Sequence, residues 1–290
     1  MAPLGRARAD DRPAIAIDTG ADSPHRGRRY VAWFRIQRDT TFDVLLSSSD
    51  DGGRTWSKPV KVNETGRELV YATVGVAANG WIYVAWEDAG KFRLNITRST
   101  DGGRTFGEEK QAASFVIVTI PSCSSGIPIR ALRLQCVHSA PLLSVDTSTG
   151  RFRGRVYLSY TQTDFQGGQG VRVTVLDPEL RTIVGFPKTR LGHPVTKVVR
   201  GRRQQFWPAS AVDPMIGAYW VCFYDTKGDP DGRTTRYACT ASTDGGRTFP
   251  PPVPVATMRS DVTQPDSDPR GYGDYEGVAA VNGVAFPIWT

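Results

Sequence analysis

Carboxylates, tyrosines and arginines stand side by side at several places in this chain of 290 residues. The segment 271–277, GYGDYEG, places two tyrosines next to two carboxylates, and the pairs Asp11-Arg12 and Glu87-Asp88 add further charged groups. Carboxylic acids transfer protons, tyrosine hydroxyls can act as nucleophiles, and arginine binds carboxylates through two parallel hydrogen bonds. These residue types therefore permit acid–base chemistry on an acidic ligand.

Arginine accounts for most of the positive charge. The net charge is +7, and arginine supplies 29 of the 36 basic residues. Because arginine suits bidentate binding of carboxylate or phosphate, an acidic ligand is one interpretation, and a dispersed basic surface is the other. Basic residues cluster only at 26–29 and 200–203, and no nucleic-acid-binding motif accompanies them. We expect no nucleic-acid partner.

One octapeptide, Ser-Xaa-Asp-Xaa-Gly-Xaa-Thr-(Trp/Phe), occurs three times, at 49–56, 99–106 and 242–249. Its first two copies begin 50 residues apart, a spacing that is typical of a repeat array. Each copy lies between β-rich runs and predicts a hairpin turn, in which the aspartate accepts backbone N–H groups and the Gly-Gly pair adopts positive φ. The final aromatic ring is expected to pack beneath the turn. We expect structural roles for the three aspartates Asp51, Asp101 and Asp244.

Alternating apolar and polar residues predict β-strands along the chain, and no segment shows helical periodicity. Five times, an apolar strand, a short turn and an aromatic-rich second strand follow one another. These units span Pro13–Phe34, Ala72–Asp88, Ala140–Tyr160, Trp207–Asp225 and Gly273–Thr290. Four-stranded sheets in a ring bury their faces against one another and leave only short edges. We therefore predict an all-β chain, a β-propeller of four-stranded antiparallel blades with five blade starts.

The predicted domain organisation is a charged leader, 1–12, and one propeller domain, 13–290, with an insertion at 115–137. The second and third octapeptides begin 143 residues apart. The insertion and one unit with a degenerate octapeptide, LDPELRTIVGF at 176–186, account for that distance. Because the fifth unit stops after two predicted strands, we expect a ring that lacks part of its sequence or closes with fewer blades.

The octapeptide is the pattern called the Asp-box, and the chain resembles the sialidase (neuraminidase) superfamily of β-propellers and their BNR-repeat relatives. The resemblance covers nearly the whole chain as a fold. It implies a six-bladed ring in which the boxes lie between the third and fourth strands of a blade, on the rim away from the active site. It also implies a glycoside hydrolase that acts on the terminal acidic sugars of glycans.

A propeller binds its ligand over the central axis, among the residues that begin each inner strand and the loops that follow each second strand. Sialidase chemistry needs arginines for the sugar carboxylate, a tyrosine nucleophile activated by a glutamate, and an aspartic acid that protonates the leaving oxygen. The residues that the resemblance assigns to substrate binding are Arg12, Arg35, Arg38, Trp207, Tyr224 and Asp274. Those assigned to catalysis are Tyr275 or Tyr272 as nucleophile, Glu87 or Glu276 as base, and Asp11 or Asp88 as acid. Tyr71 and His138 also lie at strand starts, without an assigned role.

The chain departs from the sialidase pattern in one respect, because it has no Arg-Ile-Pro motif. The nearest string, Phe34-Arg35-Ile36-Gln37, lacks the proline, so Arg35 is not carried over as the arginine of that motif. Three functions stay open: a sialidase-type glycosidase, a non-catalytic extracellular propeller that binds glycan or protein, and a lyase or hydrolase of another acidic polysaccharide. Three arginines around one point on the axis, opposite a Tyr–Glu contact, would favour the glycosidase. Arginines around the rim would favour binding alone.

The four cysteines form two plausible local pairs. Cys222 and Cys239 face each other across a predicted hairpin, and Cys123 and Cys136 bracket the inserted loop, although four cysteines allow three connectivities. Disulfides would indicate a secreted or otherwise extracytoplasmic protein. The first residues contain no apolar signal-peptide core, and no stretch is long and apolar enough to span a membrane.

No cofactor or metal is expected. Neither a CxxC spacing nor a nearby histidine pair is present for zinc. The string 229–232, Asp-Pro-Asp-Gly, is rich in oxygen ligands but lacks the spacing of a calcium loop. We expect a monomer whose partner is a glycan or another acidic carbohydrate.

Overall fold

The computed structural model of the chain describes residues 7–39, 41–64, 66, 68–116, 126–132, 135–163, 169–183, 192–196, 203–262, 264, 272–273 and 275–290. Strands dominate these residues, and the helical elements among them are two single 3-10 turns, η1 (Ala89–Lys91) and η2 (Arg130–Leu132). Within this described part, no helix has the length and apolar character needed to cross a membrane.

Four antiparallel sheets of four strands follow one another along the chain, and in each sheet the strands pair in chain order. The first sheet contains β1 (Ala7–Ile17), β2 (Arg29–Gln37), β3 (Phe42–Ser49) and β4 (Val60–Lys61). The second contains β5 (Leu69–Val76), β6 (Ile82–Asp88), β7 (Arg93–Ser99) and β8 (Lys110–Ser114). The third contains β11 (Leu142–Val145), β12 (Val156–Thr163), β13 (Gln169–Leu176) and β14 (His193–Pro194). The fourth contains β15 (Gln205–Val212), β16 (Tyr219–Asp225), β17 (Arg236–Ser242) and β18 (Val253–Pro254).

Two shorter hairpins complete the described structure. The fifth sheet pairs β19 (Gly277–Val281) with β20 (Val284–Ile288), and the inserted segment forms a hairpin of β9 (Ile127–Ile129) and β10 (Gln135–Val137). The apolar side chains of this inserted hairpin pack with Trp207 against the fourth sheet, although the hairpin precedes the third sheet in the chain. Strand β1 starts inside the segment that the sequence assigns to a leader.

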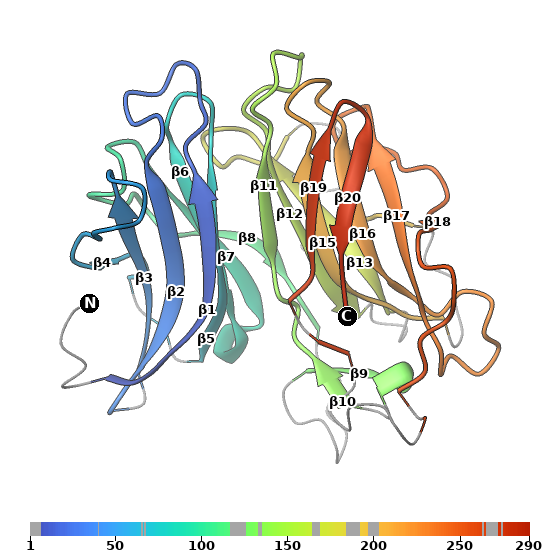
Figure 1. The fold of residues 1–290 in the computed structure, drawn as a ribbon. Coiled ribbons are helices and arrows are strands. Elements are labelled where there is room, and N and C mark those ends of the chain that lie inside the picture. The colour runs from blue at the N-terminus through green and yellow to red at the C-terminus, as the bar shows by residue number, and fades with distance from the viewer. Residues whose placement is uncertain are drawn as a thin grey trace.

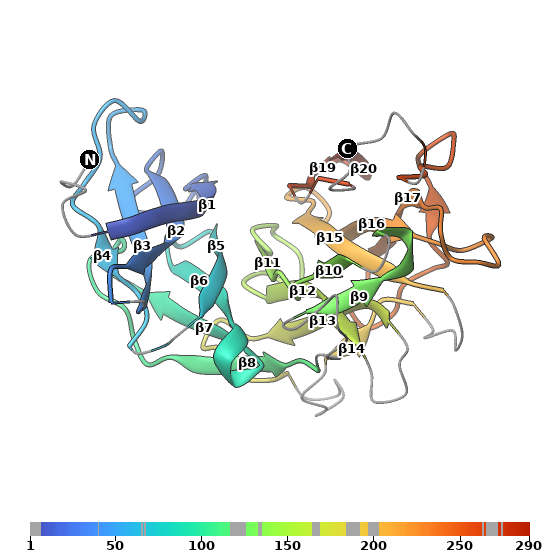
Figure 2. The same ribbon diagram turned by 90° about the horizontal axis from the view of Figure 1, so that it is seen from below.

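The sheets stand side by side in an arc, with β1 at one end and the β19–β20 hairpin at the other (Figures 1 and 2). Separate hydrophobic clusters fill the spaces between neighbouring sheets. Trp86 lies between the first and second sheets, Leu143 between the second and third, and Tyr219 between the third and fourth. Each sheet is therefore a blade that buries its faces against its neighbours. The chain has the fold of a β-propeller.

The burial patterns of the second strands follow from this arrangement. Every residue of β6 and β12 is buried, because each of these strands has a neighbouring sheet on both faces. Strand β2, at one end of the arc, alternates buried and half-buried residues over its first six positions. In β20, at the other end, every second residue is exposed, including Phe286 at 57%. Burial on both faces explains why these two strands show no alternation of buried and exposed positions.

The three octapeptide turns have the predicted geometry. In the second copy, Asp101 accepts hydrogen bonds from the Thr105 backbone N–H (3.0 Å), the Thr105 hydroxyl (2.6 Å) and the Ser99 hydroxyl (2.7 Å). The Ser99 Oγ in turn accepts the Gly103 N–H. Gly103 has φ 84°, and a Cβ there would lie 2.8 Å from Leu46 of the first sheet, so both its conformation and its packing require glycine. The other two copies repeat these bonds.

Hydrogen bonding lowers the pKa of each octapeptide aspartate. For Asp101 and Asp244, burial would raise the pKa. The hydrogen bonds from the threonine that follows each aspartate and from the serine that precedes it outweigh burial and bring the pKa to about 2. For Asp51, the bonds from Thr55 lower the pKa further. The carboxylates are therefore held in the ionised form by the turns that they organise.

The aromatic residue of the octapeptide packs as predicted in two copies and not in the first. Phe106 and Phe249 lie against the clusters that each blade shares with the preceding blade. Trp56 is 39% exposed and donates its indole N–H to Gly53 O. The prediction was wrong for Trp56 because, within the described chain, no sheet precedes the first one to receive its ring.

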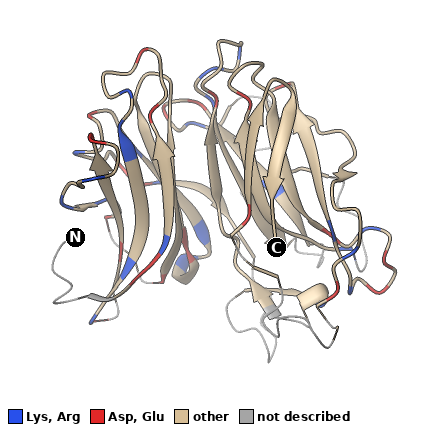
Figure 3. Cartoon of the chain, in the orientation of Figure 1, with Lys and Arg blue, Asp and Glu red and all other residues tan. Residues whose placement is uncertain are grey.

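Several arginines join neighbouring blades, so the arginine excess has structural uses. Arg28 of the first blade donates to Gly102 O in the second octapeptide, and Arg155 of the third blade donates to Gly245 O in the last one. Arg98 of the second blade reaches Pro178 O in the degenerate copy, where Asp177 accepts the Arg181 N–H. Figure 3 shows basic residues on several sheets and turns. This spread fits a dispersed basic surface.

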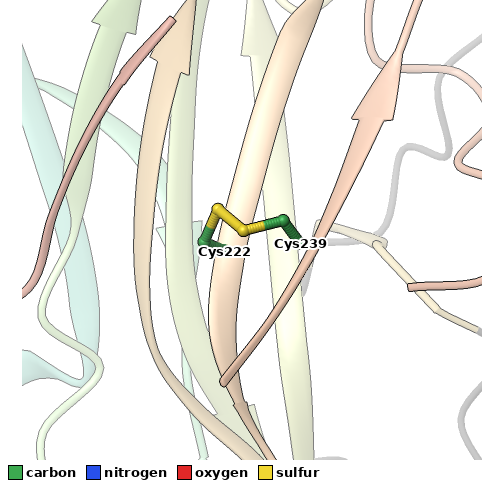
Figure 4. The surroundings of a disulfide bond; sticks show 2 residues. All are labelled: Cys222 and Cys239. Carbon is green, nitrogen blue, oxygen red and sulfur yellow. A yellow bond between two sulfur atoms is a disulfide. The ribbon is translucent and has the colours of Figure 1, made fainter. Parts of the chain in front are cut away.

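The disulfide between Cys222 and Cys239 is present, as predicted (Figure 4). The two cysteines are opposite each other in the β16–β17 register, with Cα atoms 4.0 Å apart. Cys136 is not free. Cys123, its predicted partner, lies outside the described residues.

Candidate active site on the propeller axis

The inner strand of each four-stranded blade has an unusual backbone conformation at or near its start, except in β1, where it occurs in the middle of the strand. A non-glycine residue with positive φ interrupts the chain there: Arg12 (52°), Tyr71 (55°), Ala140 (45°) and Trp207 (46°). In three blades the strand register shifts at this residue, which identifies a β-bulge. Such a conformation costs on the order of 1–3 kcal/mol and is found preferentially at functional sites. We call these four positions the strand-start bulges.

The strand-start bulges aim at one cavity of about 190 Å³, which we call the axis cavity. All four four-stranded blades contribute to it, and the segment before β19 supplies two more residues. The lining consists of Arg12, Pro13, Ala14, Tyr71, Ala72, Thr73, Ala140, Pro141, Leu142, Trp207, Pro208, Tyr275 and Glu276. A proline follows three of the four bulge residues, and because proline has no N–H to give to a sheet, it suits an irregular strand start.

The axis cavity lies at the opposite end of the blades from the octapeptide turns. Strand β19 runs upward in Figure 1, so the cavity residues just before it lie at the lower end. Strands β3 and β17 also run upward, so the octapeptides that follow them lie at the upper end. Any chemistry in the cavity is therefore separated from the turns by the length of a blade.

Arg12 is the cation that lines the axis cavity. Its guanidinium carbon lies 4.2 Å from the ring centre of Tyr71 and 5.3 Å from that of Tyr275, so cation–π contacts hold it between two tyrosines. The Arg12 backbone N–H donates to the Asp11 carboxylate (2.8 Å), which fixes the bulge locally. A guanidinium held in this way is suited to bind the carboxylate of a sugar.

A buried carboxylate lies behind the cavity wall. Glu87 is 1% exposed, and its two oxygens contact His138 Nδ1 (2.9 Å) and the Ala140 backbone N–H (3.0 Å). The His138 ring packs on Tyr71 with 5.1 Å between ring centres. Glu87 thus links the second blade to the third and orients a histidine that touches a residue of the cavity.

Two more predicted residues line the cavity. Trp207 is 9% exposed, and its backbone N–H donates to the Thr161 hydroxyl (3.1 Å) of the third blade. Glu276 follows Tyr275 at the start of the fifth sheet and is half-buried. Among the described residues that line the cavity are one cation (Arg12), one carboxylate (Glu276) and the aromatic side chains of Tyr71, Trp207 and Tyr275. Asp274, predicted beside them, lies outside the described residues.

The other predicted substrate-binding residues that the structure describes lie outside the axis cavity. Arg35 forms a two-bond ion pair with Asp10, at 2.5 and 2.7 Å, and Arg38 is exposed at the turn after β2. The hydroxyl of Tyr224 donates to Thr290 O (2.6 Å), and burial raises the pKa of Tyr224 to about 12. These residues are not among those that line the axis cavity.

The remaining predicted catalytic residues also lie outside the cavity lining. The hydroxyl of Tyr272 donates to Ser260 O (2.8 Å) in the core of the fourth blade, and burial raises the pKa of this tyrosine. Asp88 is fully buried, caps η1 and forms an ion pair with Arg93. Burial raises the pKa of Asp88, although Arg93 acts against the shift.

Tyr71 and His138 contact each other beside the cavity, and the sequence pattern predicted only that both lie at strand starts. A signal for the bulges is present in the chain: Arg12-Pro13, Ala140-Pro141 and Trp207-Pro208 each precede an apolar run, and Tyr71-Ala72 occupies the same place. No local pattern joins Glu87 to His138, which are 51 residues apart.

The described residues contain no group of three or more histidine, cysteine or acidic side chains placed to hold a metal ion. The carboxylate of Asp229 accepts hydrogen bonds from the backbone N–H groups of Asp231, Arg233 and Thr234 in the same turn. The Thr234 hydroxyl also donates to Asp229 (2.7 Å), and this bond together with the backbone bonds overcomes the effect of burial and brings the pKa of Asp229 to about 2. The oxygen-rich string at 229–232 therefore has a structural explanation.

Comparisons with known proteins identify the fold. No family model matches the chain, and no curated protein matches it. Solved structures of similar fold include an α-L-arabinanase from Penicillium chrysogenum complexed with arabinobiose. It is 13% identical, with a TM-score of 0.54, over 94% of this chain and 74% of that one. A Hadza microbial sialidase is 16% identical, with a TM-score of 0.51, over 93% of this chain and 48% of that one.

A protein of unknown function from Dyadobacter fermentans is also similar. It is 14% identical, with a TM-score of 0.51, over 94% of this chain and 72% of that one. At identities of 13–16% these likenesses establish the propeller fold alone.

Proposed function

We propose that this chain is a secreted, sialidase-like glycoside hydrolase that binds the terminal acidic sugar of a glycan in the axis cavity. The observation that carries the proposal is the position of Arg12, held by Tyr71 and Tyr275 in a cavity to which all four four-stranded blades contribute. A sugar carboxylate would pair with the guanidinium, while the aromatic rings would pack on the apolar faces of the sugar.

Two further observations support this proposal. Similar propellers include a sialidase and an arabinanase, so the fold is one on which sugar chemistry occurs, although fold analogy alone does not establish activity. The disulfide between Cys222 and Cys239 is compatible with an oxidising compartment. A carboxylate and two tyrosines in the cavity supply the group types that glycoside hydrolysis needs.

Non-catalytic binding of a glycan or protein is the second candidate, and a specific observation favours it. Of the three predicted carboxylate-binding arginines, only Arg12 lines the cavity, while Arg35 is paired with Asp10. The Glu87 carboxylate, predicted as a base for tyrosine, contacts His138 and Ala140 instead. A recognition site would need neither an arginine cluster nor a Tyr–Glu pair.

The test is release of 4-methylumbelliferone from its α-sialoside by the folded, oxidised protein, run beside calorimetric binding of N-acetylneuraminic acid. Turnover that is lost in Arg12→Ala supports the hydrolase. Binding without turnover supports the second candidate. Absence of both binding and turnover, in protein shown by circular dichroism to be folded, contradicts a sialic-acid ligand for this cavity.

A further inference from the structure

Among the described residues, the sheets at the two ends of the arc have a neighbouring sheet on one side only, and each presents an apolar face on its other side (Figure 2). In the first sheet, Ile15 and Ile17 of β1 are exposed, Ile15 at 64%, and Ile15 shares a face with Val31, its partner in the β1–β2 register. In the fifth sheet, Phe286 and Ile288 of β20 are exposed on one face. Contiguous apolar surface of this kind is typical of an interaction site.

Within the chain, each junction between neighbouring blades joins two different faces. We call the face that a blade turns toward the preceding blade its entry face, and the face toward the following blade its exit face. Tyr83 and Ala85, on the exit face of the second blade, share a cluster with Leu158 on the entry face of the third. Tyr157, on the exit face of the third blade, stacks on Tyr219 of the fourth with 4.2 Å between ring centres. Exit face against entry face is therefore the way in which the blades of this chain pack.

The uncovered entry face of the first blade consists of Ile15, Ile17, Val31 and Trp33. Trp33 lies opposite the strand-start bulge, the place that Trp86 has in the second blade and Phe223 in the fourth. Packing with the preceding blade buries Trp86 and Phe223 completely, whereas Trp33 is half-buried. The first blade thus presents the kind of face that receives another sheet elsewhere in the molecule.

The uncovered exit face of the fifth sheet consists of Ala279, Val281, Val284, Phe286 and Ile288. In the β19–β20 register Val281 lies opposite Val284, and Ala279 lies opposite Phe286, so these side chains form one apolar surface. The length of β20 exposes every second residue to solvent on this side.

Charge does not oppose contact between these two faces. Residues 277–288 contain no ionisable side chain, so no charge on the exit face has to lose its water when the face is covered. On the entry face, Arg29 and Arg35 lie toward the two ends of β2, and Arg35 is paired with Asp10. An apolar centre with charged side chains at its margin is the usual composition of a protein interface.

We propose that copies of this chain associate head to tail, with the exit face of the fifth sheet in one copy packed on the entry face of the first blade in the next. Contact between two exit faces would leave the entry face of the first blade uncovered, whereas the head-to-tail contact covers both faces. Because the two faces differ, each copy binds two neighbours, and association continues beyond a dimer into a ring or a filament. Head-to-tail association replaces the monomer expected from the sequence. It is independent of the axis cavity, whose lining includes neither Ile15 nor Phe286.

The first experiment is sedimentation velocity over a wide range of protein concentration, on oxidised protein shown by circular dichroism to be folded. Wild-type protein should form species larger than a dimer at high concentration. Ile15→Asp and Phe286→Asp should each weaken self-association by at least roughly tenfold, because the contact would bury an unpaired carboxylate. The matched control is Met258→Asp, which changes an exposed apolar side chain outside both faces and should associate as the wild type does. Wild-type protein that stays monomeric throughout overturns the inference, and so does an equal loss in Met258→Asp.

A mixture of the two variants tests the direction of the contact. Ile15→Asp keeps its exit face and Phe286→Asp keeps its entry face, so an equimolar mixture should form a heterodimer that stops at two copies. Restored association also shows that both variants are folded. A mixture that stays monomeric overturns the head-to-tail contact, and so does undiminished association of Ile15→Asp alone, which would mean that two exit faces meet. Neither experiment uses a sugar, so their outcome is separate from that of the proposed function.

Discussion

The octapeptide turns and the strand-start bulges lie at opposite ends of the same blades, and both recur from blade to blade. At the turn end the residues are repeated: Asp101 and Asp244 accept the same hydrogen bonds from the same residue types. At the bulge end only the backbone is repeated, while the side chains differ, as Arg12 and Tyr71 do. The octapeptide turns repeat the same hydrogen bonds, whereas the strand-start bulges place different side chains in one cavity.

The difference shows how to interpret repeats in a propeller. A turn that depends on a carboxylate needs the same residue each time, so its sequence stays recognisable. A bulge needs only a backbone shape, so each copy is free to carry a different group, and a binding site needs several different groups. The most visible motif in this chain therefore identifies the fold, and the site lies where the sequence varies.

Arg12→Ala should have the largest effect on sugar binding and should leave the octapeptide turns unchanged. Loss of charge-assisted hydrogen bonds should weaken binding of N-acetylneuraminic acid roughly 10- to 100-fold, as measured by calorimetry. The matched control is Arg104→Ala, which removes an exposed charge from the second octapeptide at the far end of the blade. Equal losses in the two variants would mean that net charge, not the cavity, holds the sugar.

Acid should destabilise the octapeptide turns. The pKa values of Asp101 and Asp244 are about 2 in the folded protein, below the usual value near 4 for the unfolded chain. A depressed folded-state pKa contributes stability that is present above pH 4 and is lost as the pH falls toward 2. The urea midpoint should therefore drop over this interval. A constant midpoint from pH 4 to pH 2 would contradict the assigned role of these carboxylates.

Asp101→Ala tests a single turn. Its four hydrogen bonds lie partly in water, so we expect a loss of roughly 1–3 kcal/mol in the free energy of unfolding. Sugar binding should not change, since the cavity is at the other end of the blade. Urea unfolding and calorimetry on one preparation give both quantities, and weakened binding in a folded variant would show that the two ends are coupled.

Sequence patterns predicted the blades well because they depend on local chemistry. Alternation located the strands, and the cross-strand pair Cys222–Cys239 followed from the hairpin register. Contacts between distant segments were not predictable in this way. The pairing of Glu87 with His138 depends on how two blades meet. The exposure of Trp56 depends on whether a sheet lies beside it.

Arg35→Ala should have the smallest effect on sugar binding. It compares two arginines of the first blade that both lie at the cavity end. Arg35 lies beside the bulge of the first blade in the β1–β2 register but is paired with Asp10 at a partly exposed position, an interaction that contributes at most about 1 kcal/mol. We expect the Kd for N-acetylneuraminic acid to change less than about twofold by calorimetry. A loss as large as that of Arg12→Ala would restore Arg35 to a carboxylate-binding cluster.

The central claim is that an acidic sugar binds between Arg12 and its two tyrosines. The most direct measurement is an NMR titration of protein labelled in its arginine and tyrosine side chains with N-acetylneuraminic acid. The account predicts saturable shifts of the Arg12 guanidinium and of the Tyr71 and Tyr275 rings, while Arg104 in the octapeptide stays unchanged. Shifts confined to the octapeptide end, or none at saturating sugar, would contradict it.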